Sequence, residues 1–307
     1  MRKESFSQKV KDELLALPFS SEAEAGMWLC SALAANGVFR GTEVSIKSAR
    51  KSLIRTLADI SEKIFGFRGE IIERKTHAYW QVKSREASDI IRESMERRLG
   101  FDCVRGIMNL NAEYFPETMQ LAALRAFILT VGSFAEPMKS YQIEFSLRRQ
   151  SVLEFLADIL DGMGIESLLQ RQGAYHMLYI KNGDDIAALL GKTGAHKAYL
   201  SFEDIRLRKN INEAVNRAVN CDNANLQRVA DTAARQIHLL RRLNEAGGFG
   251  KLPEDLAAVA RLRIEHPGCS LRELGEYMNP PLGKSGMYHR LGKLEAWAED
   301  YLEKRED

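Results

Sequence analysis

The sequence predicts an α+β protein in which a duplicated unit of helices and strands is followed by an all-α domain. Three observations support this prediction. The same order of helices and strands occurs twice in the first two hundred residues, with an offset near 95–98 residues. Alternating apolar and polar residues indicate strands in both copies. Near the C-terminus, two short amphipathic segments flank a Pro-Pro pair, which ends a helix.

The chain of 307 residues is long enough for two domains, each with its own core. Its hydrophobic content of 45% and its charged content of 28% are ordinary for a globular protein. No apolar run approaches the roughly 18–20 residues that a membrane span needs, and the N-terminus lacks the apolar core of a signal peptide. We therefore expect a cytoplasmic protein without a membrane partner.

The first copy of the repeat covers about residues 22–99. A helix over Glu22–Asn36 ends at Gly37, and the alternation in Thr42–Lys47 predicts a half-buried strand. The segments that follow predict a helix, the two strands of a hairpin and a last helix, in the order Arg50–Phe65, Arg68–Arg74, Ala78–Lys83 and Glu86–Leu99.

The second copy covers about residues 117–190 in the same order. A helix over Glu117–Val131 ends at Gly132, and Tyr141–Leu147 alternates as a strand does. A helix, two hairpin strands and a helix are then predicted over Ser151–Met163, Ile165–Arg171, Tyr175–Lys181 and Asp184–Leu190. A constant offset over this many elements favours duplication over coincidence.

The two glycine-terminated helices, which end with Leu29–Gly37 and Leu124–Gly132, resemble degenerate LAGLIDADG helices. In that family the two helices pack side by side on small residues, and an acidic residue before each glycine holds a divalent metal at the scissile phosphates. Asn36 and Val131 stand at these positions here. An amide is a poor ligand for a hard cation, and valine is none. The resemblance therefore implies the architecture without catalytic residues, a metal or another cofactor.

The segment Glu203–Ala246 contains no proline or glycine and carries apolar residues at helical spacing. We interpret it as two helices with a break at Asn220–Asn223, where Asp222 or Asn223 would cap the second helix. The pair Gly247-Gly248 predicts a hinge to a terminal domain.

Six asparagines lie between positions 210 and 225. Asparagine serves in caps and turns, and it also binds phosphates and bases, so two interpretations stay open. In the second interpretation this segment contacts DNA through Arg208, Lys209 and Arg217.

The segment Ser270–Leu294 has the pattern of a helix-turn-helix. Ser270 and Glu273 have capping-box spacing, and Asn279-Pro280-Pro281 ends the helix that they begin. A second helix begins near Gly283–Ser285, with polar and basic residues in its first turns, as in helices that enter a major groove. The residues expected to contact DNA are Arg272 on the first helix and Lys284, Ser285, Tyr288, His289, Arg290 and Lys293 on the second.

The net charge of +2 hides two basic stretches. From Arg206 to Arg242 eight Lys and Arg residues stand against three acids, and from Arg261 to Lys293 six stand against three. Such patches favour phosphate binding. In the duplicated part, by contrast, Glu43 and Glu144 lie on the predicted exposed sides of strands and would repel phosphate. The cysteines and histidines show no metal-ligand spacing.

Together these segments resemble the WhiA family of bacterial sporulation and cell-division transcriptional regulators. The resemblance spans nearly the whole chain and rests on Ser5–Leu14, Leu124–Pro137, Asn210–Asn225 and Ser270–Leu294. It implies a LAGLIDADG-like scaffold, a C-terminal helix-turn-helix and binding to double-stranded DNA. In some lineages it also implies a partner transcription factor. Gly283 departs from the serine expected before the recognition helix, although glycine is an acceptable N-cap.

We therefore expect a duplicated LAGLIDADG-like domain over residues 1–200, a helical linker over 201–250 and a helix-turn-helix domain over 251–307. The predicted function is sequence-specific DNA-binding transcription regulation of the sporulation and cell-division type, in the cytoplasm and on the nucleoid. We predict no enzyme activity, and no small-molecule substrate is evident. Two alternatives stay open: a metal-dependent DNA endonuclease that uses other carboxylates, and a chromosome-associated scaffold that recruits proteins. The target sequence, the sign of regulation, the oligomeric state and a ligand between the repeats also stay open.

Overall fold

The computed structural model describes residues 4–306. The chain divides into two compact units, Met1–Lys209 and Asn210–Asp307. The division lies within a long helix, α8 (His196–Glu245), which contributes residues to both units. Among the described residues, no helix is long and apolar enough to cross a membrane.

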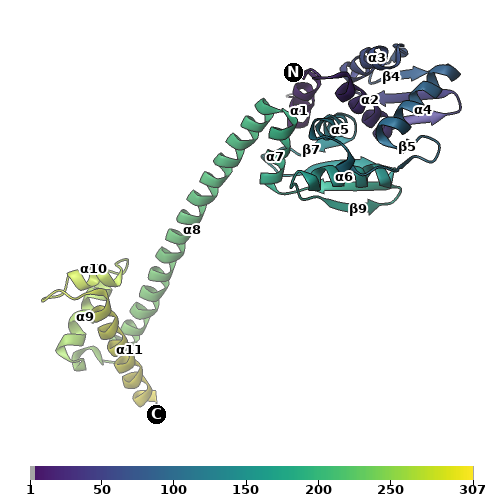
Figure 1. Ribbon diagram of the computed structural model, residues 1–307. Helices are drawn as coiled ribbons and strands as arrows, with labels where there is room; N and C mark the ends of the chain where they lie inside the picture. The colour runs from purple at the N-terminus through teal and green to yellow at the C-terminus, as the bar shows by residue number, and fades with distance from the viewer. Residues whose placement is uncertain (1–3, 307) are drawn as a thin grey trace. The chain divides into compact units, whose positions relative to one another are not determined.

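The first repeat is a four-stranded antiparallel sheet with helices against one face (Figure 1). Its strands have the order β1-β2-β4-β3. Val44 lies opposite Val82 and Ile46 opposite Trp80, and all four side chains are buried, so one face of the sheet forms core. The elements are α2 (Glu22–Asn36), β1 (Gly37–Arg40), β2 (Glu43–Ser48), α3 (Lys51–Phe65), β3 (Glu70–Glu73), β4 (Ala78–Val82) and α4 (Arg85–Leu99).

The second repeat has the same elements in the same order. Its strand order, β7-β8-β10-β9, corresponds position by position to that of the first sheet. The predicted duplication is therefore confirmed. The elements are α5 (Glu117–Thr130), β7 (Gly132–Phe134), β8 (Ile143–Leu147), α6 (Gln150–Gly162), β9 (Leu168–Gln172), β10 (Tyr175–Ile180) and α7 (Gly183–Thr193).

The two repeats meet where α2 packs against α5. Both helices are buried over most of their length and are rich in alanine, which permits close approach. Gly37 and Gly132 begin the strands that follow directly. A Cβ atom at Gly37 would lie 2.4 Å from the carbonyl oxygen of Leu33, and one at Gly132 would lie 2.9 Å from that of Ile128. Only glycine lets the strand leave so close to the last helical turn.

Several elements of the first unit lack a strong pattern and were not predicted. The short edge strands β1 and β7 have too few residues to alternate clearly, and the same holds for β5 (Phe101–Asp102), β6 (Ile107–Met108) and the 3₁₀ turn η1 (Ala112–Tyr114). Helix α1 (Phe6–Leu15) does have a signal. Its capping box joins Ser5 and Gln8. Phe6, Val10 and Leu14 are buried and follow one another at intervals of four residues.

The predicted helix break at Asn220–Asn223 is wrong, because α8 runs without interruption from His196 to Glu245. Asparagine costs only a few tenths of a kcal/mol to about 0.7 kcal/mol per residue in a helix interior, unlike proline. Pairs at i,i+4 such as Gln227 with Asp231 at 2.8 Å support the helix locally. A run of asparagines without glycine or proline therefore does not end a helix.

The second unit has its own core, formed by the C-terminal turns of α8 and three further helices. These are α9 (Glu254–Glu265), α10 (Leu271–Glu276) and α11 (Lys284–Glu306), with the 3₁₀ turn η2 (Phe249–Lys251) before α9. Leu240 and Leu243 of α8 are buried in this core together with Leu291 of α11. The last part of the predicted linker, residues 201–250, thus packs inside the second unit.

Candidate nucleic-acid interface

Helices α10 and α11 form the predicted helix-turn-helix. The side chain of Ser270 accepts a hydrogen bond from the backbone of Glu273, whose carboxylate accepts one from the backbone of Ser270 at 2.7 Å. This confirms the capping box. The backbone N–H of Leu282 donates to the carbonyl oxygen of Gly275 at 2.9 Å. A Cβ atom at Gly275 would lie 2.1 Å from the carbonyl oxygen of Leu282, so the tight turn requires glycine.

Helix α11 begins at Lys284, as expected, with the carbonyl oxygen of Gly283 accepting from Met287. Met287, Leu291 and Leu294 are buried and fix the helix on the core. On the opposite side, the first three turns expose a row of polar and aromatic side chains: Lys284, Ser285, Tyr288, His289 and Lys293. Tyr288 is 66% exposed. Arg290 is partly buried at the edge of this row. A row of exposed side chains on a helix whose opposite face is packed against the core is suited to contacting base edges in a DNA groove.

A cavity of about 470 Å³ lies beside the start of α11 and is lined by residues of four helices. It contains four cationic side chains and no carboxylate, and its lining residues are Arg228, Val229, Thr232, Arg263, Ser270, Leu271, Arg272 and Lys284. Converging positive charges attract phosphate oxygens. This cavity, here called the α11 cavity, therefore extends the exposed row of α11 by a cationic surface.

Arg263 is the unusual member of the α11 cavity because it is only 2% exposed. Its guanidinium donates to the carbonyl oxygen of Cys269 at 2.9 Å, and its Nε atom has no hydrogen-bond partner among the described residues. Burial lowers the pKa of Arg263. Among the described residues no carboxylate forms an ion pair with Arg263, although Glu295 lies near enough to raise its pKa, and a buried guanidinium without such a pair favours a further anion nearby.

The structure brings together only some of the predicted contact residues. Arg272 and Lys284 both line the α11 cavity. Arg208 and Lys209 belong to the first unit, where Lys209 donates to the carbonyl oxygen of Pro137 at 3.4 Å and lies 4.4 Å from the centre of the Tyr141 ring. Arg217 lies on α8 in the second unit and faces Glu213 at 3.8 Å.

Sequence reasoning missed Arg228 and Arg263. Arg263 had a recognisable signal, since it continues the apolar spacing of Leu256, Val259 and Ala260 on the buried side of α9. A cation in such a position is seldom a surface residue. Arg228 had no such signal, because its place beside α10 and α11 depends on tertiary packing.

In the first unit, the ends of the two central helices carry cations. Asn36 uses its side chain to donate to the carbonyl oxygen of Lys47 at 3.2 Å, and Val131 follows the last turn of α5. Arg149 donates to the carbonyl oxygens of Ala34 and Gly37, each at 2.7 Å.

The equivalent carbonyl of α5, Leu129, accepts a hydrogen bond from Lys11 at 3.5 Å. Across the described part of the chain, no group of three or more His, Cys, Asp or Glu side chains is placed to hold a metal. The helix ends thus receive positive charge from the protein's own side chains.

Comparison with known proteins assigns both units. Residues 120–212 match the family described as the WhiA LAGLIDADG-like domain, and residues 215–298 match the WhiA C-terminal HTH domain. A probable cell division protein WhiA of Clostridium perfringens is 34% identical over 313 residues, which cover 96% of this chain and 98% of the relative. Its counterpart in Ruminiclostridium cellulolyticum is 33% identical and covers 96% and 97%.

Solved structures agree with this assignment. The crystal structure of full-length DUF199/WhiA from Thermotoga maritima has a TM-score of 0.57 at 26% identity, covering 97% of this chain and 99% of that chain. The isolated N-terminal LAGLIDADG domain of DUF199/WhiA matches with a TM-score of 0.50 at 21% identity, which supports the fold of the first unit.

The fold and the interface define a protein in which a LAGLIDADG-like domain precedes a helix-turn-helix domain. Such a helix-turn-helix marks a DNA-binding protein. The chain belongs to the WhiA family.

Proposed function

We propose that this protein is a sequence-specific regulator that binds double-stranded DNA through α11 and the α11 cavity. The observation that carries the proposal is the exposed row on α11 directly beside a cavity with four cations and no carboxylate. Base edges are read by side chains in the groove, whereas phosphate contacts set register and supply most of the salt-dependent affinity.

The two kinds of contact fall on different residues. Ser285, Tyr288 and His289 are exposed on the first turns of α11 and are assigned to the bases, with Arg290 at the edge of the row and Lys293 one turn further along. Arg228, Arg272 and Lys284 converge on the α11 cavity and are assigned to a backbone phosphate. This division supports recognition of a sequence and not only of charge.

The test is a salt titration of full-length protein on DNA fragments that copurify with it in its host. Replacing Tyr288 or Arg290 with Ala should weaken binding to the selected fragment by about 1–3 kcal/mol and leave binding to unrelated DNA nearly unchanged. Replacing Arg272 or Lys284 with Ala should weaken binding to the selected fragment and to unrelated DNA alike. It should also reduce the salt slope, which is the dependence of the logarithm of the binding constant on the logarithm of the salt concentration, by about 0.9 for each phosphate that the variant no longer neutralises. Wild-type affinity in the Arg290→Ala, Lys284→Ala double variant would contradict the assignment.

For the first unit we infer a scaffold that does not cleave DNA. Asn36 and Val131 stand at the positions where the LAGLIDADG family has its metal ligands, and cations contact the carbonyl oxygens of both helix ends. A fixed ammonium or guanidinium at these carbonyls opposes the binding of a divalent cation. The endonuclease alternative would have to use other carboxylates, and the protein-recruiting scaffold differs from our proposal only in its partners.

Several finer assignments rest on the relatives. Those cited above carry the name probable cell division protein, so we propose a role in cell division, with sporulation and a partner transcription factor as the further expectations of the family. Nucleoid association follows from the proposed DNA binding. Chromatin immunoprecipitation from the host, with the Tyr288→Ala variant as control, would test both the target genes and this location.

A further inference from the structure

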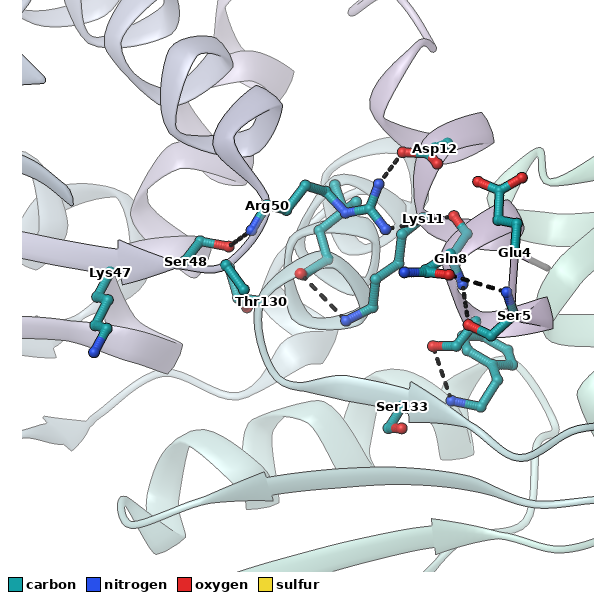
Figure 2. A pocket seen from close by; sticks show the side chains of 14 residues that line it. Glu4, Ser5, Gln8, Lys11, Asp12, Lys47, Ser48, Arg50, Thr130 and Ser133 are labelled. Carbon is teal, nitrogen blue, oxygen red and sulfur yellow. Dashed lines mark hydrogen bonds and ion pairs between the residues drawn. The ribbon is translucent and has the colours of Figure 1, made fainter. Parts of the chain in front are cut away.

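A large polar cavity of about 920 Å³ lies at the C-terminal end of α5 (Figure 2). Three segments form it: α1, the loop between β2 and α3, and the turn from α5 into β7. Lys11 and Arg50 lie close together in its centre, and Lys47 and Ser133 line it from the two strands. We call it the α5 cavity. Its residues belong to the first unit, whereas those of the proposed DNA interface belong to the second.

The α5 cavity has a counterpart in the other repeat that differs in one respect. Arg50 and Arg149 each stand directly before a helix, α3 and α6, with nearly the same backbone angles of −88° and 101° for Arg50 and −92° and 101° for Arg149. Arg149 turns inward, donates to two carbonyl oxygens at the end of α2, and lies 5.7 Å from the Phe101 ring. The remaining cavity at the end of α2 measures about 550 Å³.

Arg50 turns the other way. Its guanidinium pairs with Asp12 and donates to the backbone oxygen of Gln8 at 3.5 Å. The carbonyl of Leu129, 95 residues after Ala34, is left to Lys11 at 3.5 Å. The α5 cavity is thus the larger of the two. In it, Arg50 has an acidic partner, and the half-buried ammonium of Lys11 has only a long hydrogen bond to a carbonyl oxygen.

Lys11 is in an unfavourable position for a cation. Burial, together with the nearby positive charge of Arg50, lowers the pKa of Lys11 to about 8. No carboxylate lies within ion-pair distance of its ammonium among the residues that the structure describes. A ligand with negative charge would favour the charged form of Lys11, and the hydroxyl groups of Ser48 and Ser133 line the same cavity as further donors.

We propose that the α5 cavity binds a small phosphorylated metabolite, with the phosphate held by Lys11 and by donors from β2 and β7. Glu4 and Asp12 face the same cavity, and Glu144 stands opposite Ser133 in the sheet. These acids would repel the continuous charge of a DNA backbone, whereas near Lys11 the charge of Asp12 is offset by its pairing with Arg50, so a single phosphate meets less repulsion there. The volume of the cavity leaves room for the remainder of such a ligand.

The first experiment is isothermal titration calorimetry of the full-length protein with pyrophosphate and with sulfate. Sulfate is included because its charge does not change between pH 7 and pH 9. Lys11→Met removes the ammonium and keeps the stem, and Lys9→Met on the exposed side of the same helix is the matched control. We expect Lys11→Met to lower the affinity for both anions by about tenfold or more, which is the effect of one charge-assisted hydrogen bond. Lys11→Arg should retain part of the affinity, and Lys9→Met should bind both anions as the wild type does.

The pH dependence has a definite sign. Anion binding raises the pKa of Lys11 above its value of about 8 in the free protein, so binding takes up a proton where the free amine is neutral. Sulfate affinity should therefore be highest below about pH 8 and fall as the pH rises through that value. Asp12, Glu4, Arg50 and Lys47 also face the cavity, so the Lys11→Met variant, which should lose this dependence, isolates the contribution of Lys11.

A second variant keeps the proposal testable if Lys11→Met fails to fold. Ser133 is exposed on β7, and Ser133→Asp adds a negative charge to the cavity without disturbing the core. It should abolish sulfate and pyrophosphate binding and leave the melting temperature nearly unchanged. Absence of anion binding by the wild type, or equal losses in Lys9→Met and Lys11→Met, would overturn the proposal.

A DNA arm separates the free metabolite from a DNA phosphate. If the ligand is a free metabolite, Lys11→Met and Lys9→Met should have the same salt slope for DNA binding. A slope reduced by about 0.9 in Lys11→Met alone would assign the cavity to the DNA backbone and overturn the metabolite proposal. If the protein binds no DNA at all, the proposed function fails, whereas the calorimetric result still decides whether the α5 cavity binds a phosphorylated metabolite.

Discussion

The guanidinium of Arg149, in the second repeat, donates to the carbonyl oxygen of Ala34 at the end of α2 in the first repeat, at 2.7 Å. The last carbonyls of a helix have no partner within the helix and carry partial negative charge, so a cation at this place both satisfies and stabilises them. The same side chain donates to Gly37, the first residue of β1. One residue thus fixes the point where a buried helix becomes an edge strand.

Removing Arg149 should destabilise the first unit. We expect Arg149→Met to lower the free energy of unfolding by roughly 1–3 kcal/mol, because two carbonyl oxygens lose a charged donor. Denaturant unfolding followed by circular dichroism measures this change. The neighbouring Arg148 is exposed and lies 5.0 Å from the Tyr175 ring, so Arg148→Met is the control and should change stability by about 0.5 kcal/mol or less. Equal effects of the two substitutions would show that the carbonyl contacts contribute little.

Arg228 should contribute to DNA binding although it lies on α8 and outside the helix-turn-helix pattern. Because it shares the α11 cavity with Arg272 and Lys284, Arg228→Ala should reduce the salt slope of DNA binding by about 0.9 on specific and on unrelated DNA alike. Arg235→Ala, an exposed substitution on the same helix that does not line the cavity, should leave the slope unchanged. Fluorescence anisotropy over a range of salt concentrations gives both slopes, and a weakening confined to one DNA sequence would indicate a base contact instead.

Divalent metals should neither activate nor stabilise the protein. Lys11 and Arg149 contact the carbonyls at the two helix ends, so Mg²⁺ placed there would meet positive charge, and among the described residues no group of three or more acids, histidines or cysteines is placed to hold it. We expect no nicking of plasmid or operator DNA with Mg²⁺ or Mn²⁺ and no shift of the melting temperature with either ion.

The nearest acids after the two glycines, Glu43 and Glu136, provide the control for the metal experiment. Glu136 already accepts a hydrogen bond from the backbone of Phe6 at 3.4 Å. Metal-dependent nicking by the purified protein that disappears in Glu43→Gln or Glu136→Gln would restore the endonuclease interpretation.

The second unit should need the end of α8 to fold. A fragment that begins at Asn210 keeps Leu240 and Leu243, which are buried in the second core, whereas one that begins at Lys251 loses both. Deleting a buried leucine side chain costs roughly 2–5 kcal/mol, so the shorter fragment should be mostly unfolded at 25 °C. Thermal unfolding of the two fragments tests this prediction. A cooperative transition of equal midpoint in the shorter fragment would support independent folding of residues 251–307.

Limited proteolysis tests the predicted hinge at the same place. A Cβ atom at Gly248 would lie 2.4 Å from Leu243 and 2.7 Å from Tyr301, so this glycine is packed against α8 and α11. We therefore expect the Gly247–Gly250 segment to resist cleavage in the full-length protein. Early cleavage there would show that this packing opens readily.

The sequence predicted the elements whose patterns are local and long enough to repeat. The strands Glu43–Ser48 and Ile143–Leu147 alternate between buried and partly exposed residues, and the capping box at Ser270 needs only four neighbouring positions. The edge strands β1 and β7 have at most four residues, so alternation could not identify them. The asparagine run in α8 was misleading because a cap and a helix interior can have the same composition.

The candidate sites were predictable only in part, for a different physical reason. The exposed row on α11 follows from the periodicity of one helix, and Tyr288 could be assigned from that spacing alone. Arg149 is 115 residues from its acceptor Ala34, and Lys11 is 118 residues from Leu129. Arg228 meets Lys284 in a cavity that four helices form together. Such pairings depend on how the elements pack, and one sequence carries no pattern that identifies them.

The α2–α5 pair has a consequence for how the first unit unfolds. Besides the Arg149 contact, Arg125 of α5 pairs with the buried carboxylate of Glu24 in α2 at 3.0 Å, and the apolar side chains of these two packed helices are mostly buried. Neither repeat alone would cover its central helix. Although the sequence consists of two repeats, we therefore expect the two halves to unfold together as one cooperative unit, with a single peak of heat absorption in calorimetry.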